Sequence, residues 1–247
     1  MRLRKLRAAV EAGHAIGEVA GLSARELERR LELVPAGPPR PALEPILAAV
    51  ESLDAASSER LLGAQLAALG GPRFVRQVAS PLLVEIGARW EDGRICVASE
   101  HLASSILRNL LGGLVRPTGA GTSAPPIVFT TPPGERHELG ALMAAVAAAD
   151  VGGHPVFLGP DLPVEEVAVA VEALSAAAVA VGVCRRNGGE HAASLRALRA
   201  ILPEAVEIWV GGPGAAELAL PRGVACVDDP EDLERKVALL ALRGGPG

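Results

Sequence analysis

The sequence predicts an α-helical bundle followed by an α/β domain built on a five-stranded, flavodoxin-like (Rossmann-like) parallel sheet. Residues 42–115 have helical periodicity, whereas residues 125–243 alternate short β-branched runs with helical stretches, which is typical of βαβ units. Segments rich in Pro and Gly at 34–41 and 116–126 flank the bundle. With 49% hydrophobic and 21% charged residues, the 247-residue chain has enough apolar material for one large domain or two small ones.

Residues 1–33 are predicted to form two helices. Apolar residues recur at helical spacing among the basic residues near the start of the chain. Ser23 and Glu26 have the spacing of a capping box, which would open a second helix that ends at Leu33. The sequence VPAGPPRP at 34–41 is expected to be a semi-rigid linker.

The bundle is expected to contain four helices. Either Ser57 or Ser58 is positioned to cap the second helix, and Pro81 is expected to kink the third. The turn at 91–93 is short enough to make the third and fourth helices antiparallel neighbours. The expected helices span residues 42–54, 57–69, 72–90 and 95–115.

In the α/β domain a helix follows each predicted strand, so the strands are expected to be parallel and covered on both faces. A flavodoxin-like strand order places the switch point, where ligands bind such sheets, beside the turn after the first strand. The expected strands span residues 127–131, 154–158, 178–183, 206–210 and 223–227. The expected helices span residues 138–149, 163–174, 190–201, 215–219 and 230–242.

The turn after the first predicted strand has the sequence PPGERHELG at 132–140. It lacks the second histidine that a zinc protease needs and presents one imidazole, that of His137. Glu135 is placed to accept the other ring N–H of this histidine, and Gly140 would let a bulky ligand approach the backbone. Arg136 completes the candidate ligand-binding residues of this turn. The alternative is a loop histidine that only contacts solvent.

Composition narrows the classes of function. The net charge of −5 argues against a nucleic-acid-binding surface over the whole chain, and three widely spaced cysteines indicate neither a disulfide framework nor a zinc site. Without a signal-peptide pattern or an uninterrupted apolar stretch of membrane-spanning length, a cytoplasmic location with no membrane contact is expected. No Ser-His-Asp, Cys-His or paired-carboxylate set points to catalysis by side chains, although a cofactor can supply chemistry of its own.

The turn at 132–140 resembles the base-off/His-on cobalamin-binding motif, in which a histidine is the lower axial ligand of cobalt. Its flanks, VFTTPPGERHELGALMAA and HPVFLGPDLP, resemble CarH-type regulators, the cobalamin-dependent light sensors of the MerR family, and the resemblance covers nearly the whole chain. It implies that His137 binds cobalt and that the cofactor is adenosylcobalamin, with methylcobalamin as the alternative. Residues 1–33 resemble the end of a MerR-type DNA-binding domain whose helix-turn-helix would lie upstream and is missing here, so DNA binding by this chain alone is not expected.

A second motif resembles the cap that CarH-type sensors place over the upper face of the corrin. Trp90 is followed, after nine residues, by Glu100 and His101. The resemblance implies that Trp90 packs against the upper ligand of cobalt and excludes water from a labile cobalt–carbon bond, while Val97, Glu100 and His101 line the pocket of that ligand. Without the resemblance, Trp90 would cover the end of the bundle, and the two polar residues would be solvated in the first turn of a helix.

Two positions depart from the family pattern. The well-known light sensors have a histidine after the tryptophan that captures cobalt after photolysis, whereas this chain has Glu91, a harder and poorer ligand for low-spin cobalt. Either His101 or water takes that place, or the response to light differs. After the third strand, the family's Ser-x-Leu is replaced by Gly182-Val183-Cys184, which loses a hydrogen bond to the displaced benzimidazole but leaves space for the nucleotide tail.

Gly211 and Gly212, after the fourth strand, match the paired glycine of the family, where the nucleotide tail approaches the backbone closely. Trp209 is expected in the core. Cys184 and Cys226 fall on predicted strands and are expected to be buried small hydrophobes. The histidines without supporting neighbours are expected at the surface: His14, His154 and His191.

The function implied by the resemblance is a cobalamin-binding sensor that responds to light or to cobalamin through a change in self-association or through a protein partner. The alternative is a corrinoid carrier or a cobalamin-dependent enzyme, because methyltransferase modules share the helical cap and the histidine motif. A third interpretation is a scaffold that has lost cobalamin.

Overall fold

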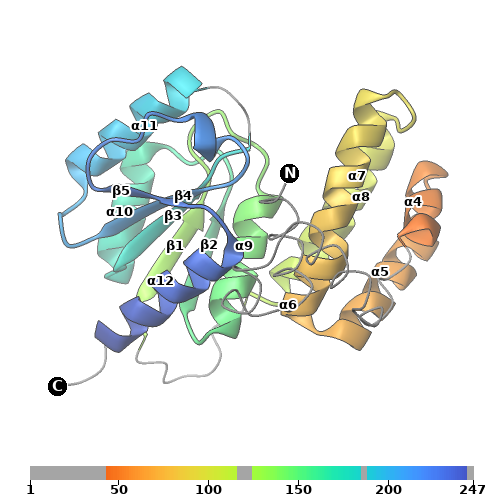
Figure 1. The fold of residues 1–247 in the computed structure, drawn as a ribbon, viewed down its shortest axis with the longest axis horizontal. Helices are drawn as coiled ribbons and strands as arrows, with labels where there is room; N and C mark the ends of the chain where they lie inside the picture. The colour runs from red at the N-terminus through yellow and green to blue at the C-terminus, as the bar shows by residue number, and fades with distance from the viewer. Residues whose placement is uncertain (1–42, 116–123, 185–187, 244–247) are drawn as a thin grey trace, which may run out of the picture. The chain divides into compact units, whose positions relative to one another are not determined.

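The computed structural model describes residues 43–115, 124–184 and 188–243. The predictions for residues 1–33 and for the linker at 34–41 therefore lie outside the described residues. The helical part (Figure 1) comprises α4 (Glu44–Glu51), α5 (Ala55–Leu69), α6 (Gly71–Phe74), η1 (Val75–Ala79), α7 (Ser80–Glu91) and α8 (Val97–Gly112). The α/β part comprises β1 (Pro126–Thr130), α9 (Leu139–Asp150), β2 (His154–Gly159), α10 (Val164–Leu174), β3 (Ala178–Gly182), α11 (Gly188–Ile201), β4 (Glu207–Gly211), η2 (Ala215–Glu217), β5 (Val224–Val227) and α12 (Pro230–Arg243).

The second bundle helix, α5, begins earlier than predicted. Its N-cap is Asp54, whose carboxylate accepts the backbone N–H of Ser57 at 3.0 Å, a contact that lowers the pKa of Asp54. Ser58 is buried and donates its hydroxyl to the carbonyl of Asp54 at 2.8 Å. The prediction that Ser57 or Ser58 caps this helix was therefore wrong, because an aspartate three residues before Ser57 reaches the free backbone N–H first.

The third bundle helix continues from Gly71 to Glu91 but is irregular in its middle. At η1 the helix widens into a π-helical turn, in which the backbone N–H of Ser80 donates to the carbonyl of Val75. Pro81 comes directly after this turn. Because proline has no N–H to donate and its ring crowds the preceding turn, a wider turn accommodates it. The irregularity expected from Pro81 takes the form of this π-helical turn.

One hydrophobic core fills the bundle and continues into the α/β part. Phe74, Leu82 and Leu107 are fully buried in it, and Leu142 and Val146 of α9 belong to the same cluster. α9 contacts both α6 and α8. The bundle and the sheet therefore share α9 as a common element.

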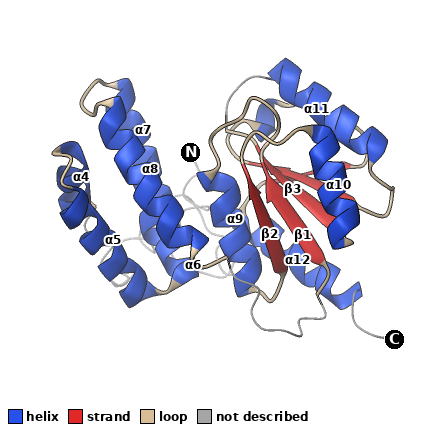
Figure 2. Ribbon diagram, turned by 180° about the vertical axis from the view of Figure 1, so that it is seen from behind, coloured by secondary structure: helices blue, strands red, loops and turns tan. Residues whose placement is uncertain are grey.

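The sheet has the strand order β2-β1-β3-β4-β5 with all neighbours parallel, which confirms the predicted flavodoxin-like order. Figure 2 shows helices on both faces of the sheet. Ile127 and Phe129 pack on the side of α9 and α12, and Val128 packs on the side of α10 and α11, as the alternation of side chains along a strand requires. Trp209 of β4 lies in the core at 1% exposure, as predicted.

Two smaller predictions in the α/β part were wrong or imprecise. The helix expected at 215–219 is the single 3-10 turn η2, whose hydrogen bonds run from the N–H of Ala215 to the carbonyl of Gly212 and from the N–H of Leu218 to the carbonyl of Ala215. Strand ends differ from the predicted ones by one residue, which is the usual uncertainty of boundaries read from a pattern. Among the described helices, none is both long and apolar enough to cross a membrane.

Candidate functional site

The turn between β1 and α9 is held rigidly at the carboxyl edge of the sheet. The hydroxyl of Thr131 donates to the carbonyl of Glu135 at 2.5 Å and accepts the backbone N–H of Asp161 at 2.9 Å. The carboxylate of Asp161 in turn accepts the backbone N–H of Gly134 at 2.7 Å. Gly134 has a φ of +82°, which glycine adopts without strain. The loop after β2 therefore clamps the histidine-bearing turn, a role for Asp161 that the sequence analysis missed.

Glu135 and His137 form the closest side-chain pair of this turn. Glu135 is completely buried, and its Oε1 lies 2.5 Å from Nδ1 of His137 while also accepting the backbone N–H of His137 at 3.0 Å. The imidazole itself is 56% exposed. A buried carboxylate thus fixes one ring nitrogen, and Nε2 has no partner among the described residues. The contact expected from the sequence is present, and cobalt binding by His137 stays a prediction.

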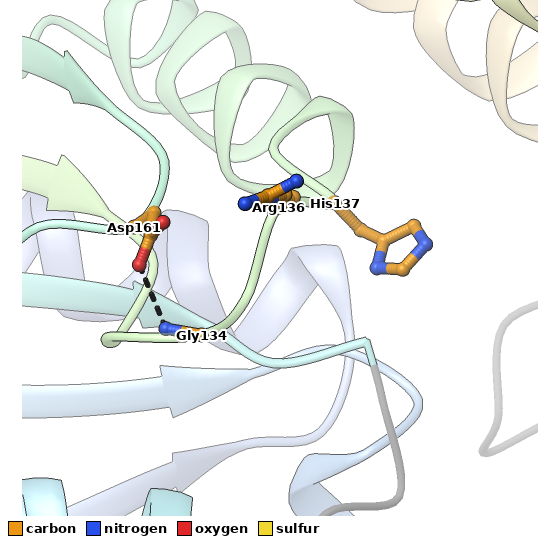
Figure 3. A pocket seen from close by; sticks show the side chains of 4 residues that line it. All are labelled: Gly134, Arg136, His137 and Asp161. Carbon is orange, nitrogen blue, oxygen red and sulfur yellow. Dashed lines mark hydrogen bonds between the residues drawn. The ribbon is translucent and has the colours of Figure 1, made fainter.

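A pocket of about 430 Å³ opens beside this histidine. Gly134, Arg136, His137 and Asp161 line it, and Figure 3 shows the His137 ring projecting away from the strands. The pocket offers a guanidinium, a carboxylate and an imidazole, so it can donate and accept hydrogen bonds as well as ligate a metal. Arg136, predicted from its place in the motif, therefore lies where it can contact a ligand of His137.

The second carboxylate oxygen of Glu135, Oε2, lies near Cys184 and His191, which were expected in a buried strand and at the surface. The backbone N–H of Cys184 donates to Oε2 of Glu135 at 3.0 Å, and Nε2 of His191 lies 3.9 Å from the same oxygen. Cys184 lies beyond the end of β3 and is exposed, so the prediction of a buried strand cysteine was wrong. His191 is only 1% exposed, so its predicted surface position was also wrong: the first turn of α11 folds back over Glu135.

The four candidate glycines differ in what their backbones require. A Cβ at Gly212, where φ is +103°, would lie 2.5 Å from the carbonyl oxygen of Val183, and one at Gly182 would lie 3.0 Å from the Cβ of Ala141. Gly211 has only ordinary contacts, and Gly140 has open space around it. Packing and backbone geometry alone thus explain Gly182 and Gly212, whereas nothing in the described structure requires a glycine at 140.

The predicted cap residues lie around the turn between α7 and α8. Trp90 is 51% exposed near the end of α7, and Val97 is 54% exposed at the start of α8. Val97 and His101 are one helical turn apart on α8, so they share a face with Glu100. Glu100 accepts the hydroxyl of Ser104 at 2.7 Å, and its other oxygen lies 3.6 Å from Nδ1 of His101. Trp90, Val97 and His101 are more than half exposed and Glu100 is partly exposed, and none of the four lines the pocket at His137.

Arg89 holds the cap turn in place. Its guanidinium, 9% exposed, contacts carboxylates of α4 and of its own helix: Glu44 at 2.9 Å, Glu51 at 2.6 Å and Glu85 at 2.8 Å. The hydrogen bonds that Arg89 donates to Glu85 and Glu51 raise the pKa of Arg89 further above its ordinary value, so it stays charged. Its carbonyl accepts the backbone N–H groups of Arg94 and Ile95 at 2.8 and 3.1 Å. The turn that carries Trp90 and Val97 is therefore anchored by a buried cation that the sequence analysis did not identify.

One ion pair connects α8 with the histidine-bearing turn. Glu138, 5% exposed and adjacent to His137, pairs with Arg108 of α8. The carboxylate lies at the N-terminal end of α9, where negative charge is favourable. The helix that carries Val97, Glu100 and His101 is thus joined directly to the turn that carries His137, even though the cap residues and His137 do not share the described pocket.

The donor set at His137 fits a metal that brings its own equatorial ligands. The imidazole offers a single free nitrogen, and the buried Glu135 fixes the tautomer that leaves Nε2 available. No group of three or more His, Cys, Asp or Glu side chains among the described residues could hold a metal ion by itself. A metal held here would take its further ligands from outside these side chains, and a Cβ at Gly140 would meet no atom within 4 Å.

Comparisons with known proteins identify the family and the fold class. Residues 42–114, the bundle, match the family model described as a B12 binding domain. The chain is 33% identical over 223 residues to the HTH-type transcriptional repressor CarH of Myxococcus xanthus, an alignment that covers 86% of this chain and 74% of CarH. It is also 32% identical over 139 residues to the repressor CarA of the same organism, covering 56% of this chain and 46% of CarA.

Among solved structures, the chain resembles the monomethylamine corrinoid protein of Methanosarcina barkeri. The TM-score is 0.58 at 15% sequence identity, and the match covers 79% of this chain and 96% of that protein. At this identity the likeness shows the fold alone: a helical bundle followed by a Rossmann-like sheet. It confirms the predicted fold class.

Proposed function

The chain belongs to the CarH family of transcriptional repressors and carries that family's B12-binding domain, and from this premise we propose that it is a cobalamin-dependent sensor. His137 is the lower axial ligand of cobalt in this proposal, bound through Nε2, with the nucleotide tail displaced. The single observation that carries it is the 2.5 Å contact between Nδ1 of His137 and the fully buried Glu135. A carboxylate in that position orients the ring and raises its basicity as a ligand.

The upper face of the cofactor is assigned to the cap residues. Adenosylcobalamin, when bound, supplies a cobalt–carbon bond that light can break. Trp90 would exclude water from that bond, Val97 would add apolar contact, and Glu100 and His101 would hydrogen-bond the adenosyl group. Their exposure supports this assignment, because Trp90 and Val97 are large apolar residues left more than half exposed beside two polar side chains.

The response to the signal is proposed to pass through the bundle. The Arg108–Glu138 ion pair and the shared core around Leu142 and Val146 join α8 to the turn that holds His137. A change in contacts at Trp90 would therefore alter how α8 packs and, with it, the surface available for self-association or for a partner. CarH and CarA are named as HTH-type repressors, so regulation of transcription is the expected output.

A corrinoid carrier is the second candidate function. The fold that this chain shares with the monomethylamine corrinoid protein is compatible with it. Glu91, exposed at the end of α7, also weakens the case for a light sensor, because a carboxylate is a poorer cobalt ligand than the histidine expected there. The upper ligand that the protein prefers separates the two candidates: adenosyl for the sensor, methyl for the carrier.

Reconstitution in the dark tests the proposal. The protein is mixed anaerobically with adenosylcobalamin or methylcobalamin, and absorption spectra and gel filtration are recorded before and after green light. The sensor predicts base-off, imidazole-ligated spectra, preference for the adenosyl form and a light-dependent change in size.

His137→Ala should abolish imidazole ligation, whereas the matched variant His154→Ala, at the start of β2, should leave it intact. A wild-type spectrum that retains benzimidazole ligation would contradict the lower-ligand assignment. A light-stable spectrum with unchanged size would remove the light response and leave cofactor binding intact.

A further inference from the structure

Among the described histidines, His191 is the one that is buried without a hydrogen-bond partner. Its side chain is 1% exposed in the first turn of α11, and neither ring nitrogen has a hydrogen-bond partner among the described residues. Leaving a buried polar group without a partner costs about 1–3 kcal/mol, so an isoleucine or leucine would be the cheaper way to fill this space. The position of this imidazole therefore calls for a functional reason.

The ring of His191 lies close to the carboxylate that orients His137. Nε2 of His191 lies 3.9 Å from Oε2 of Glu135, and the other carboxylate oxygen, Oε1, lies 2.5 Å from Nδ1 of His137. The buried carboxylate is thus flanked by two imidazoles, one on each oxygen. A movement of about 1 Å would bring His191 within hydrogen-bond distance.

We propose that His191 is a positioning residue for the lower ligand: it donates Nε2–H to Oε2 of Glu135 and so keeps Oε1 directed at His137. This inference rests on the proposed role of His137 as a metal ligand. A carboxylate anchored on one oxygen cannot rotate to exchange its oxygens, so the contact with Nδ1 persists and the ring keeps the orientation that leaves Nε2 facing outward. The backbone N–H of Cys184 donates to the same oxygen at 3.0 Å, so His191 would add a second donor to it.

Two amide substitutions separate this role from simple space filling. His191→Gln places an amide N–H close to the position of Nε2, whereas His191→Asn places it close to that of Nδ1, out of reach of Glu135. Asparagine is one methylene shorter than glutamine, so a purely structural role predicts different stability for the two variants but the same tautomer of His137 in both.

The first measurement uses the protein without cofactor. Long-range ¹H–¹⁵N NMR spectra report the tautomer of each imidazole, and the chain has only five histidines to assign. Wild type and His191→Gln should show His137 fixed with hydrogen on Nδ1, and His191→Asn should show an average of both tautomers. Identical His137 patterns in the two variants, whether fixed or averaged, would overturn the inference.

The second measurement uses adenosylcobalamin in the dark at one pH. His191→Asn should bind on the order of tenfold more weakly than wild type, the lower end of the effect seen when a ligand loses an orienting partner, and should show less imidazole-ligated cobalt. His191→Gln should recover most of both. If wild type fails to bind cobalamin, the proposed function fails while the tautomer result still decides the role of His191. If both variants bind like wild type, only the role of His191 is lost.

Discussion

Glu138 of the histidine-bearing turn pairs with Arg108 of α8, and this contact ties the proposed lower ligand to the proposed cap. The glutamate is 5% exposed and the arginine 61% exposed, so the carboxylate depends on the pair far more than the guanidinium does. Removal of either partner should therefore have unequal consequences.

Arg108→Met should lower the free energy of unfolding by about 1–2 kcal/mol, because it leaves a buried carboxylate without its cation. Glu138→Gln should cost less, since the arginine can turn to water. The double variant should reveal a coupling energy above about 0.5 kcal/mol in a denaturation cycle. The matched control is the Arg76–Glu234 pair at 3.6 Å, which also joins the bundle to the α/β part but has a more exposed carboxylate, at 31%. Equal coupling in the two cycles would contradict the prediction.

Arg89→Met should destabilise the bundle by about 2–3 kcal/mol, because it leaves three glutamates facing one another without the cation between them. The loss is smaller than for a fully buried ion pair because the glutamates are partly exposed to water. Chemical denaturation provides the measurement. Arg94→Met, which removes only the exposed pair with Asp92, should stay within about 0.5 kcal/mol of wild type. A loss of similar size in both variants would show that Arg89 has no special role.

Gly140→Ala separates a requirement of the ligand from a requirement of the fold. A Cβ at this position meets no atom within 4 Å, so the variant should be as stable as wild type or more stable by up to about 1 kcal/mol. Adenosylcobalamin binding should nevertheless weaken on the order of tenfold, equivalent to about 1.4 kcal/mol. Thermal unfolding of the free protein and titration with the cofactor give the two values.

Gly212→Ala is the opposite case and serves as the control. Here the added Cβ would meet the Val183 carbonyl at 2.5 Å, and φ is +103°, so the free protein itself should lose about 2–4 kcal/mol. If Gly140→Ala binds cobalamin like wild type, the space beside Gly140 is not where the cofactor lies.

Trp90→Ala should leave cobalamin binding intact but reduce the preference for the adenosyl over the hydroxo form on the order of tenfold, since the indole would contact only the larger ligand. Competition titrations in the dark measure this ratio. Val84→Ala removes another exposed apolar side chain from the same helix, 72% exposed, and should leave the ratio unchanged. An unaltered preference in Trp90→Ala would argue against the cap.

The sequence predicts those features that depend on local periodicity. The strand order follows from the alternation of strands and helices, and the burial of Trp209 from the composition. The contact between Glu135 and His137 follows from their spacing along one turn. The site residues that the sequence predicts lie in that turn, in the cap motif and at the glycines that end the third and fourth strands.

The features that sequence reading missed are contacts between distant segments. His191 and Cys184 lie about fifty residues from Glu135 and reach it only because β1 and β3 are neighbours in the sheet. Arg89 of α7 likewise reaches Glu44 and Glu51 of α4 across more than thirty residues of the chain. His191 was expected at the surface because the sequence shows no supporting neighbours, and nothing near Arg89 in the sequence indicates its glutamate partners on α4. No local pattern encodes which partner a folded chain will supply.

The two faces of α9 have a consequence for how the protein can be divided. Leu142 and Val146 complete the core of the bundle, while Ala145 and Ala148 complete the core beneath the sheet. Cutting the chain within residues 116–123 would expose Leu142 and Val146 of the α/β fragment to water. It would also leave the core of the bundle uncovered where α9 packs against it. Heating should accordingly melt both halves in one calorimetric step, and a functional chimera would have to exchange α8 and α9 together.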